Sequence, residues 1–190
     1  FYGTAIKELE VGKEVSSLND GIYGLKTLEK IEVEKENAGY VSEEGVLYNK
    51  EKTKLIRYPQ SKGDVTEYEV PEGVESIGEK GFYSNEKIKK VMLPESLKSI
   101  GEEAFCNCKS LTEIEIPDSV KELEKETFSG CVNLKEVVLG KSLESIGNEV
   151  FRLCGNFTKL TVKGNIKNIG SMAFYGTAIK ELEVGKEVSS

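Results

Sequence analysis

Hydrophobic residues recur along most of this chain at an interval of 23 residues. One column of the pattern contains only phenylalanine, at Phe82, Phe105, Phe128, Phe151 and Phe174. Isoleucine or leucine stands five residues before each phenylalanine, and valine, leucine or isoleucine stands eight before it. A fixed period of this length is typical of a solenoid, in which each repeat forms one coil and neighbouring coils bury a shared core.

Each repeat also contains a short segment in which polar and apolar residues alternate, as in Leu111-Thr-Glu-Ile-Glu-Ile116. Such alternation predicts a strand with one buried face, and stacked coils place these strands side by side in a parallel sheet. A proline follows three of the strands and turns the chain away. The predicted strands are residues 8–11, 30–33, 67–70, 90–93, 113–116, 136–139, 159–162 and 181–184.

The segment after each strand is expected to form the opposite side of the coil. Gly78, Gly101, Gly147 and Gly170 each follow an isoleucine and are expected to supply a bend, with Glu124 in the equivalent position of another repeat. A short helical or 3₁₀ turn carrying the phenylalanine is then expected. The predicted fold is therefore a repeat solenoid with one parallel β-sheet face and short helical or 3₁₀ turns on the other.

One repeat is longer than the others, because 31 residues separate Val33 from Val65. Within it, two apolar and aromatic runs at 44–48 and 54–59 flank the polar residues 49–53. This arrangement predicts a β-hairpin insertion at about residues 34–64.

The repeat resembles a known family. The stretch from Leu111 to Leu123, followed by Phe128-Ser-Gly-Cys131, is similar to the 23-residue leucine-rich repeat of the BspA-like class of surface proteins. The resemblance covers nearly the whole chain and includes the long repeat. It implies a leucine-rich-repeat superhelix in a secreted or cell-surface protein, with adhesion and binding to matrix proteins as its function.

The two ends of the chain share one sequence. Residues 1–17 are identical to residues 174–190. We expect residues 1–190 to form a single leucine-rich-repeat solenoid of about eight coils. Because neither end has a polar capping repeat, we also expect the chain to be a fragment of a longer array.

Composition argues against several classes of function. The chain has no histidine, which removes the commonest general base and zinc ligand, and we expect no enzyme activity, cofactor or metal site. Lys and Arg number 26 against 33 Asp and Glu, for a net charge of −7, which argues against binding nucleic acid. No run of eighteen apolar residues suggests a membrane span, and the first residues do not resemble a signal peptide.

The cysteines are expected to lie in the core. Cys108, Cys131 and Cys154 each stand three residues after a phenylalanine, so they should stack in a line. A line of sulfur atoms does not offer the converging ligands that zinc needs, and buried thiols behave as small hydrophobic groups. A disulfide, with Cys106 as a further partner, remains the alternative to a ladder of free thiols.

The outward positions of the predicted strands carry ten glutamates and three lysines. This concentration favours either a face that binds a cation or a basic partner, or an ordinary solvated strand face. Its middle combines apolar residues with charges, as the centres of protein interfaces often do. Tyrosines of the insertion either contact a partner or pack the hairpin onto its coil. The candidate binding residues are Glu67, Glu69, Lys90, Met92, Glu113, Glu115, Glu136, Val138, Tyr48 and Tyr58.

Two functions follow from this reading. The first is a non-catalytic adhesion module that binds a protein, such as a matrix-like macromolecule of a host or neighbouring cell, through the open strand face. The alternative is a passive spacer that holds other domains away from the cell.

Overall fold

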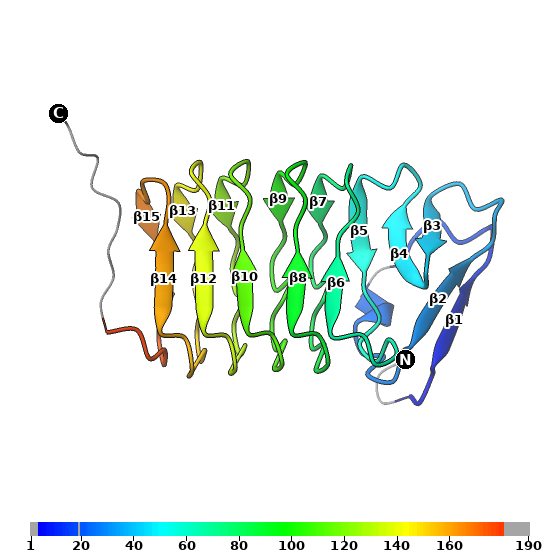
Figure 1. Cartoon of the computed structure of the whole chain (residues 1–190). Helices are drawn as coiled ribbons and strands as arrows, with labels where there is room; N and C mark the ends of the chain where they lie inside the picture. Colours follow the sequence, from blue (N-terminus) through cyan, green and yellow to red (C-terminus); the bar gives the residue numbers. More distant parts are fainter. Residues whose placement is uncertain (1–3, 19, 181–190) are drawn as a thin grey trace.

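The computed structural model describes residues 4–18 and 20–180, and it confirms the predicted solenoid (Figure 1). The chain winds through successive coils, each contributing a strand to the side that faces the viewer in Figure 1. Among the described residues, no helix has the length and apolar character needed to cross a membrane.

Seven of the eight predicted strands lie where the sequence pattern places them, and residues 181–184 fall outside the described residues. They are β1 (Glu8–Val11), β2 (Lys30–Val33), β6 (Glu67–Glu69), β8 (Lys90–Met92), β10 (Glu113–Glu115), β12 (Glu136–Leu139) and β14 (Lys159–Val162). The last five form a parallel sheet in the order β6-β8-β10-β12-β14, here called the front sheet. The insertion after β2 interrupts this face, so β1 and β2 form a separate parallel pair.

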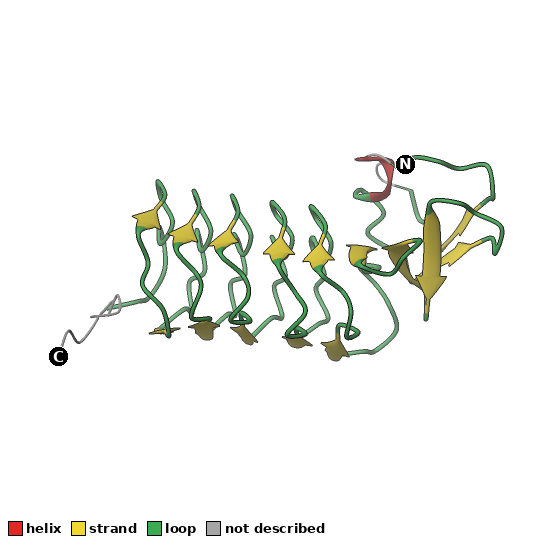
Figure 2. Ribbon diagram, turned by 90° about the horizontal axis from the view of Figure 1, so that it is seen from above, coloured by secondary structure: helices red, strands yellow, loops and turns green. Residues whose placement is uncertain are grey.

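A second row of short strands lies behind the front sheet (Figure 2). The sequence pattern predicted only the first of these strands, within the run at 54–59. They are β5 (Lys54–Arg57), β7 (Ser76–Ile77), β9 (Ser99–Ile100), β11 (Glu122–Leu123), β13 (Ser145–Ile146) and β15 (Asn168–Ile169).

The glycines after these strands allow close approach between coils. Neither Gly101 nor Gly147 has a positive φ. A Cβ on Gly101 would lie 2.7 Å from the backbone nitrogen of Glu79, and one on Gly147 would lie 2.8 Å from the carbonyl oxygen of Leu123. Because no Cβ is present, the Gly147 amide donates a 2.8 Å hydrogen bond to that Leu123 oxygen.

The predicted helical turns around the phenylalanines are nearly absent. Within the described residues the structure has one 3₁₀ helix, η1 (Asp20–Ile22), near the N-terminal end of the solenoid. The amide of Phe82 donates to the carbonyl of Ala104 in the next coil (2.7 Å), whereas the amide of Tyr83 donates to Lys80 in its own coil (3.1 Å). Alternate amides thus bond between coils and within a coil, a pattern that a helix cannot provide.

The phenylalanine column forms a stack inside the solenoid. Phe82, Phe105, Phe128 and Phe151 are 0% exposed, and successive ring centroids are 4.9, 5.2 and 5.6 Å apart. Tyr58 extends the stack by lying 5.1 Å from Phe82. Burial of whole aromatic rings supplies much of the hydrophobic stabilisation of the core.

The predicted thiol ladder is confirmed. All four cysteines are free and buried. Each thiol of the ladder donates to a phenylalanine carbonyl of the preceding coil: Cys108 to Phe82 (3.1 Å), Cys131 to Phe105 (3.0 Å) and Cys154 to Phe128 (3.1 Å). The thiols therefore satisfy buried carbonyl groups as well as filling space.

The segment predicted as an insertion contains three antiparallel strands. β3 (Tyr40–Glu43) pairs with β4 (Val46–Asn49), β4 pairs with β5, and β5 continues into the rear row through parallel pairing with β7. Glu44 and Gly45, both with positive φ, form the turn between β3 and β4.

Strand β4 also joins two hydrophobic cores. Leu47 packs in a small N-terminal cluster with residues such as Leu28 and Ile31. Val46 and Tyr48 pack in the large cluster of the solenoid. Because successive side chains of a strand point to opposite faces, one four-residue strand contributes to both cores.

We predict that Phe128→Ala destabilises the protein by roughly 3–5 kcal/mol, because it leaves a cavity in the middle of the aromatic stack. Urea denaturation followed by circular dichroism measures the change. Val132→Ala is the matched control, since Val132 is 41% exposed and its truncation should be close to neutral. Equal effects of the two substitutions would contradict the buried stack.

We predict that no thiol of the native protein reacts rapidly with Ellman's reagent at pH 8. Burial raises the pKa of Cys106 and of Cys154 to about 12, so the reactive thiolate is scarce. All four thiols should react in guanidinium chloride. A rapid native reaction would place the ladder on the surface, and a titre below four in denaturant would reveal a disulfide.

Candidate functional site

The front sheet presents its outward side chains in two columns. β10 and β12 pair Glu113 with Glu136 and Glu115 with Val138. β6 and β8 pair Glu67 with Lys90 and Glu69 with Met92. The structure therefore brings eight of the ten predicted site residues together on one surface, which we call the strand face.

A hollow of about 560 Å³ lies in the middle of the strand face, over β8, β10 and β12. Met92, which is 37% exposed, and the half-buried Val138 lie in the strands on either side of the strand that carries Glu115. The hollow thus has aliphatic walls around a carboxylate. Glu67 and Glu69 belong to the same face but lie outside the hollow.

Lysines neutralise much of the acidic charge that the sequence pattern suggested. Lys90 pairs with Glu113 across the sheet at 2.6 Å, and Lys159 pairs with Glu136 in the same way. The hydrogen bond from Lys90 to Glu113 raises the pKa of Lys90. The column of outward residues over β8 to β14 therefore consists of two ion pairs.

Lys163 is a further residue of this face, which the repeat pattern did not single out. This residue follows β14, and its ammonium group contacts the Glu115 carboxylate at 2.6 Å from two coils away. Its hydrogen bond to Glu115 raises the pKa of Lys163. Its only signal in the sequence is its position as the first residue after the strand, where other repeats have a proline or glycine that turns the chain.

Tyr48 and Tyr58 do not belong to this site, which corrects the proposed role of the insertion tyrosines in binding. Each is 1% exposed. The hydroxyl groups of Tyr48 and Tyr68 are 2.6 Å apart, and the rings of Tyr58 and Tyr68 meet edge-on at 4.7 Å. These tyrosines pack the insertion onto the first coils, and burial raises the pKa of both Tyr48 and Tyr58.

The hollow lies at a loosened junction between coils. In the rear row, β7 pairs with β9 and β11 with β13, but β9 and β11 are not paired. In the front sheet, β8 and β10 share a single register pair, Glu113 with Lys90, whereas β10 and β12 share three. Figure 1 shows the wider spacing between these two coils.

Glu124 accounts for this junction. It stands where Gly101 and Gly147 lie in other coils, and a Cβ at those glycines would collide with the preceding backbone. The two coils remain joined on the third side of the solenoid, which is formed by the phenylalanine-bearing segments. There the Phe105 amide donates to the carbonyl of Thr127 (2.9 Å). The extra side chain therefore wedges two sides of the solenoid apart, and burial raises the pKa of its own carboxyl group.

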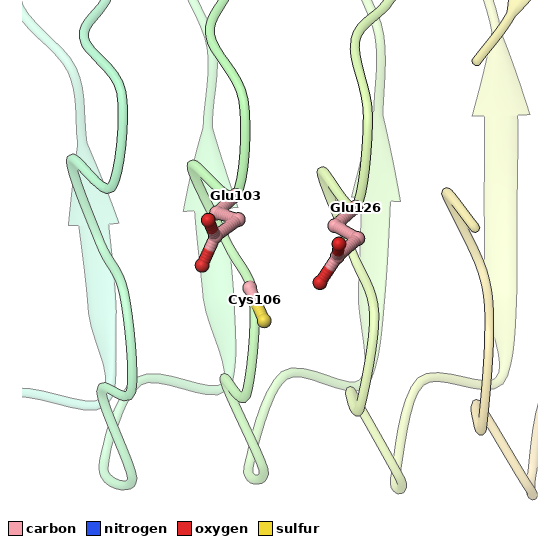
Figure 3. A group of neighbouring side chains, drawn as sticks. All are labelled: Glu103, Cys106 and Glu126. Carbon is pink, nitrogen blue, oxygen red and sulfur yellow. The ribbon is translucent and has the colours of Figure 1, made fainter. Parts of the chain in front are cut away.

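The same junction holds a group of three side chains that could in principle ligate a metal ion, drawn in Figure 3. Glu103 and Cys106 come from one coil and Glu126 from the next, and their donor atoms lie within 4.8 Å of one another. Lys80 pairs with Glu103 (3.4 Å), and Lys125 pairs with Glu126 (3.0 Å). Since these lysines balance the carboxylates and the Cys106 thiol is protonated at neutral pH, the group is explained without a bound cation.

Comparison with known proteins agrees with this architecture. Six copies of the repeat described as "BspA type Leucine rich repeat region" match residues 75–190. This chain belongs to the BspA-type leucine-rich repeat family. No protein with a curated description matches the sequence.

Several solved structures of bacterial leucine-rich repeat proteins share the fold. A protein from Eubacterium ventriosum is 28% identical with a TM-score of 0.73, over 96% of this chain and 62% of that one. The pneumococcal vaccine antigen PcpA is 28% identical with a TM-score of 0.79, over 94% and 47%. A leucine-rich cell surface protein from Faecalibacterium prausnitzii is 25% identical with a TM-score of 0.79, over 90% and 49%.

The BspA-type chain thus spans between about half and three-fifths of the length of these relatives. Leucine-rich repeat domains generally mediate protein interactions and are generally non-catalytic. The strand face offers carboxylates, ammonium groups and aliphatic side chains in regular columns, which suits recognition of a surface.

We predict that Glu124→Gly closes the junction. Without a Cβ, the coil can approach its neighbour and the amide of residue 124 can donate to the Ile100 carbonyl, as Gly147 does to Leu123. Hydrogen exchange should show protection of that amide rising by at least about tenfold. Glu124→Ala keeps the Cβ and should leave exchange fast, so equal protection in both variants would refute the wedge.

Proposed function

We propose that this chain is a non-catalytic, protein-binding module of a secreted or surface-attached bacterial adhesin, and that its strand face contacts the partner. The observation that carries the proposal is the hollow in which Met92 and Val138 flank Glu115. Protein interfaces commonly have an apolar centre with a polar rim. Met92 can adapt to the shape of a partner because its side chain is unbranched and flexible.

The charge around the hollow favours a basic partner. Five carboxylates and two lysines line it, and Lys141 and Lys159, which do not line it, pair with two more of these carboxylates, so a basic partner would exchange places with a lysine. An arginine or lysine of the partner can place its aliphatic stem between Met92 and Val138 and its charge on Glu115. It would then replace Lys163, whose ion pair is exposed to solvent and contributes little stability.

The relatives support the localisation. One is described as a cell surface protein of Faecalibacterium prausnitzii, and another is a pneumococcal vaccine antigen. A protein exposed on a bacterial surface can contact a macromolecule of a host or neighbouring cell, such as a matrix protein. A passive spacer needs no shaped face, so the hollow favours the binding module over the spacer.

We predict that the chain binds at least one member of a panel of purified extracellular-matrix proteins, measured by surface plasmon resonance. The double variant Glu113→Lys, Glu115→Lys should bind roughly tenfold more weakly, which corresponds to about 1.4 kcal/mol. Raising the salt concentration should weaken wild-type binding, because exposed charges are screened.

The control is Glu102→Lys with Glu122→Lys, since both residues are exposed and lie on the rear side of the coil. Its affinity should stay close to that of the wild type, and thermal melting verifies that both variants fold. Failure to bind any matrix protein would favour the spacer. Binding that the strand-face reversal leaves unchanged would move the interface elsewhere on the solenoid.

A further inference from the structure

The front sheet has an open edge at β6. This strand pairs with β8 on one side, and no other strand of the described residues lies beside it (Figure 1). The long coil before β6 supplies β5 to the rear row but no strand to the front sheet. The side of β2 that faces away from β1 is bonded to the hairpin, since the Ile31 amide donates to the Gly45 carbonyl (3.0 Å). An uncovered edge of this kind is a template for pairing with another chain.

The backbone of β6 leaves hydrogen-bonding groups unused at this edge. The Thr66 carbonyl accepts from β8 (3.2 Å) and the Val70 amide donates to β8 (3.0 Å). Because the backbone groups of successive strand residues point to opposite edges, those of Glu67 and Glu69 point away from β8. No hydrogen bond joins their amides or carbonyls to any residue that the structure describes. Two donors and two acceptors are therefore available in a row.

The apolar column of the sheet is uncovered at the same edge. Val65 is 36% exposed and Tyr68 is half-buried, whereas the equivalent Ile88 and Val91 of the next coil are buried. The hydroxyl group of Tyr68 is 2.6 Å from that of Tyr48, and this hydrogen bond holds the inner side of β6 in place. A strand that docks here would meet a preformed edge and would bury apolar surface.

The charge at this edge favours a basic partner. Glu67 and Glu69 are exposed, and neither forms an ion pair with a described residue, whereas the other glutamates of the front sheet each pair with a lysine. Strand β8 gives the matching pattern on its side, since Lys90 stands opposite Glu67. The next residue of β8, Val91, points into the core. Alternating basic and β-branched residues therefore suit a strand on the open side of β6 as well.

We propose that β6 accepts an extended segment of a partner protein as an additional strand, and that lysine or arginine alternates with β-branched residues in this segment. Its backbone bonds to the free groups of Glu67 and Glu69, and its basic side chains lie beside the two carboxylates. Its apolar side chains cover Val65 and Tyr68. In strand addition the main chain supplies affinity and alternate side chains supply specificity. The site lies outside the hollow over β8, β10 and β12.

Amide hydrogen exchange measured by NMR on the complete chain tests the proposal. The probe is a capped hexapeptide of alternating lysine and valine, which should bind with a Kd below about 1 mM. At saturation, exchange of the Glu67 and Glu69 amides should slow by at least about threefold. The Val70 amide is the internal control, because it is already bonded to β8 and should change little. Unchanged exchange at Glu67 and Glu69, or no detectable binding, would overturn the proposal.

A second peptide separates strand addition from attraction between charges. It has the same composition in block order, with three lysines followed by three valines. Its charge is the same, but an extended strand of this sequence cannot place all lysines on one face and all valines on the other. It should bind at least about fivefold more weakly than the alternating peptide. Equal affinities would mean that charge alone attracts the peptide, and the proposal would then be wrong.

Variants locate the site. The pair Glu67→Gln, Glu69→Gln should weaken binding of the alternating peptide by about three- to tenfold. Its matched control is Glu113→Gln, Glu115→Gln, which removes the same charge from the same face and should leave the Kd within about twofold. Glu69→Pro removes one free amide without removing a bond to β8, and it should also weaken binding. Thermal melting verifies that each variant folds.

These variants also separate the edge from the hollow. A loss of peptide binding in the Glu113 and Glu115 variant, with none in the Glu67 and Glu69 variant, would place the peptide in the hollow. That result would overturn the edge site and leave the proposed function intact. Conversely, matrix-protein binding through the hollow should persist in Glu69→Pro, so either proposal can fail without the other.

Discussion

The spacing between coils is the constraint on which this solenoid depends. Backbone amides bond from one coil to the next on three sides, so each coil must approach its neighbour closely along all of them. The phenylalanine rings stack at 4.9 to 5.6 Å because this spacing brings them into contact. The thiols reach the carbonyls of the preceding coil for the same reason. Glycine stands after the rear strands because any Cβ would hold two coils apart.

The candidate binding surface arises where one coil departs from this rule. Glu124 replaces a glycine, the rear row loses the pairing of β9 with β11, and the front sheet opens at the same junction. The hollow with Met92 and Val138 lies over this opening. A repeat protein gains a distinct site in this way without an additional loop or domain.

The repeat pattern predicted the elements that depend on side-chain burial. The front strands, the phenylalanine stack and the thiol ladder all follow from apolar columns in register. Apart from β5, the rear strands were not predicted, because they are two residues long and are held by backbone bonds that leave no alternation in the sequence. The prediction of helical turns was wrong for a related reason, since about half of the amides in these segments bond to the next coil. Lys163 was missed because its partner Glu115 lies two coils away, a distance along the chain that no local pattern reveals.

The direction of the bonds between coils has a mechanical consequence. They run along the axis of the solenoid, so a pulling force on the two ends loads one junction at a time and does not shear many bonds together. The β8–β10 junction, with a single front register pair and no rear pairing, is the weakest link among the front-sheet junctions. Under tension the protein should open at this junction first and then lengthen in steps, one junction after another, so that each step dissipates part of the applied force.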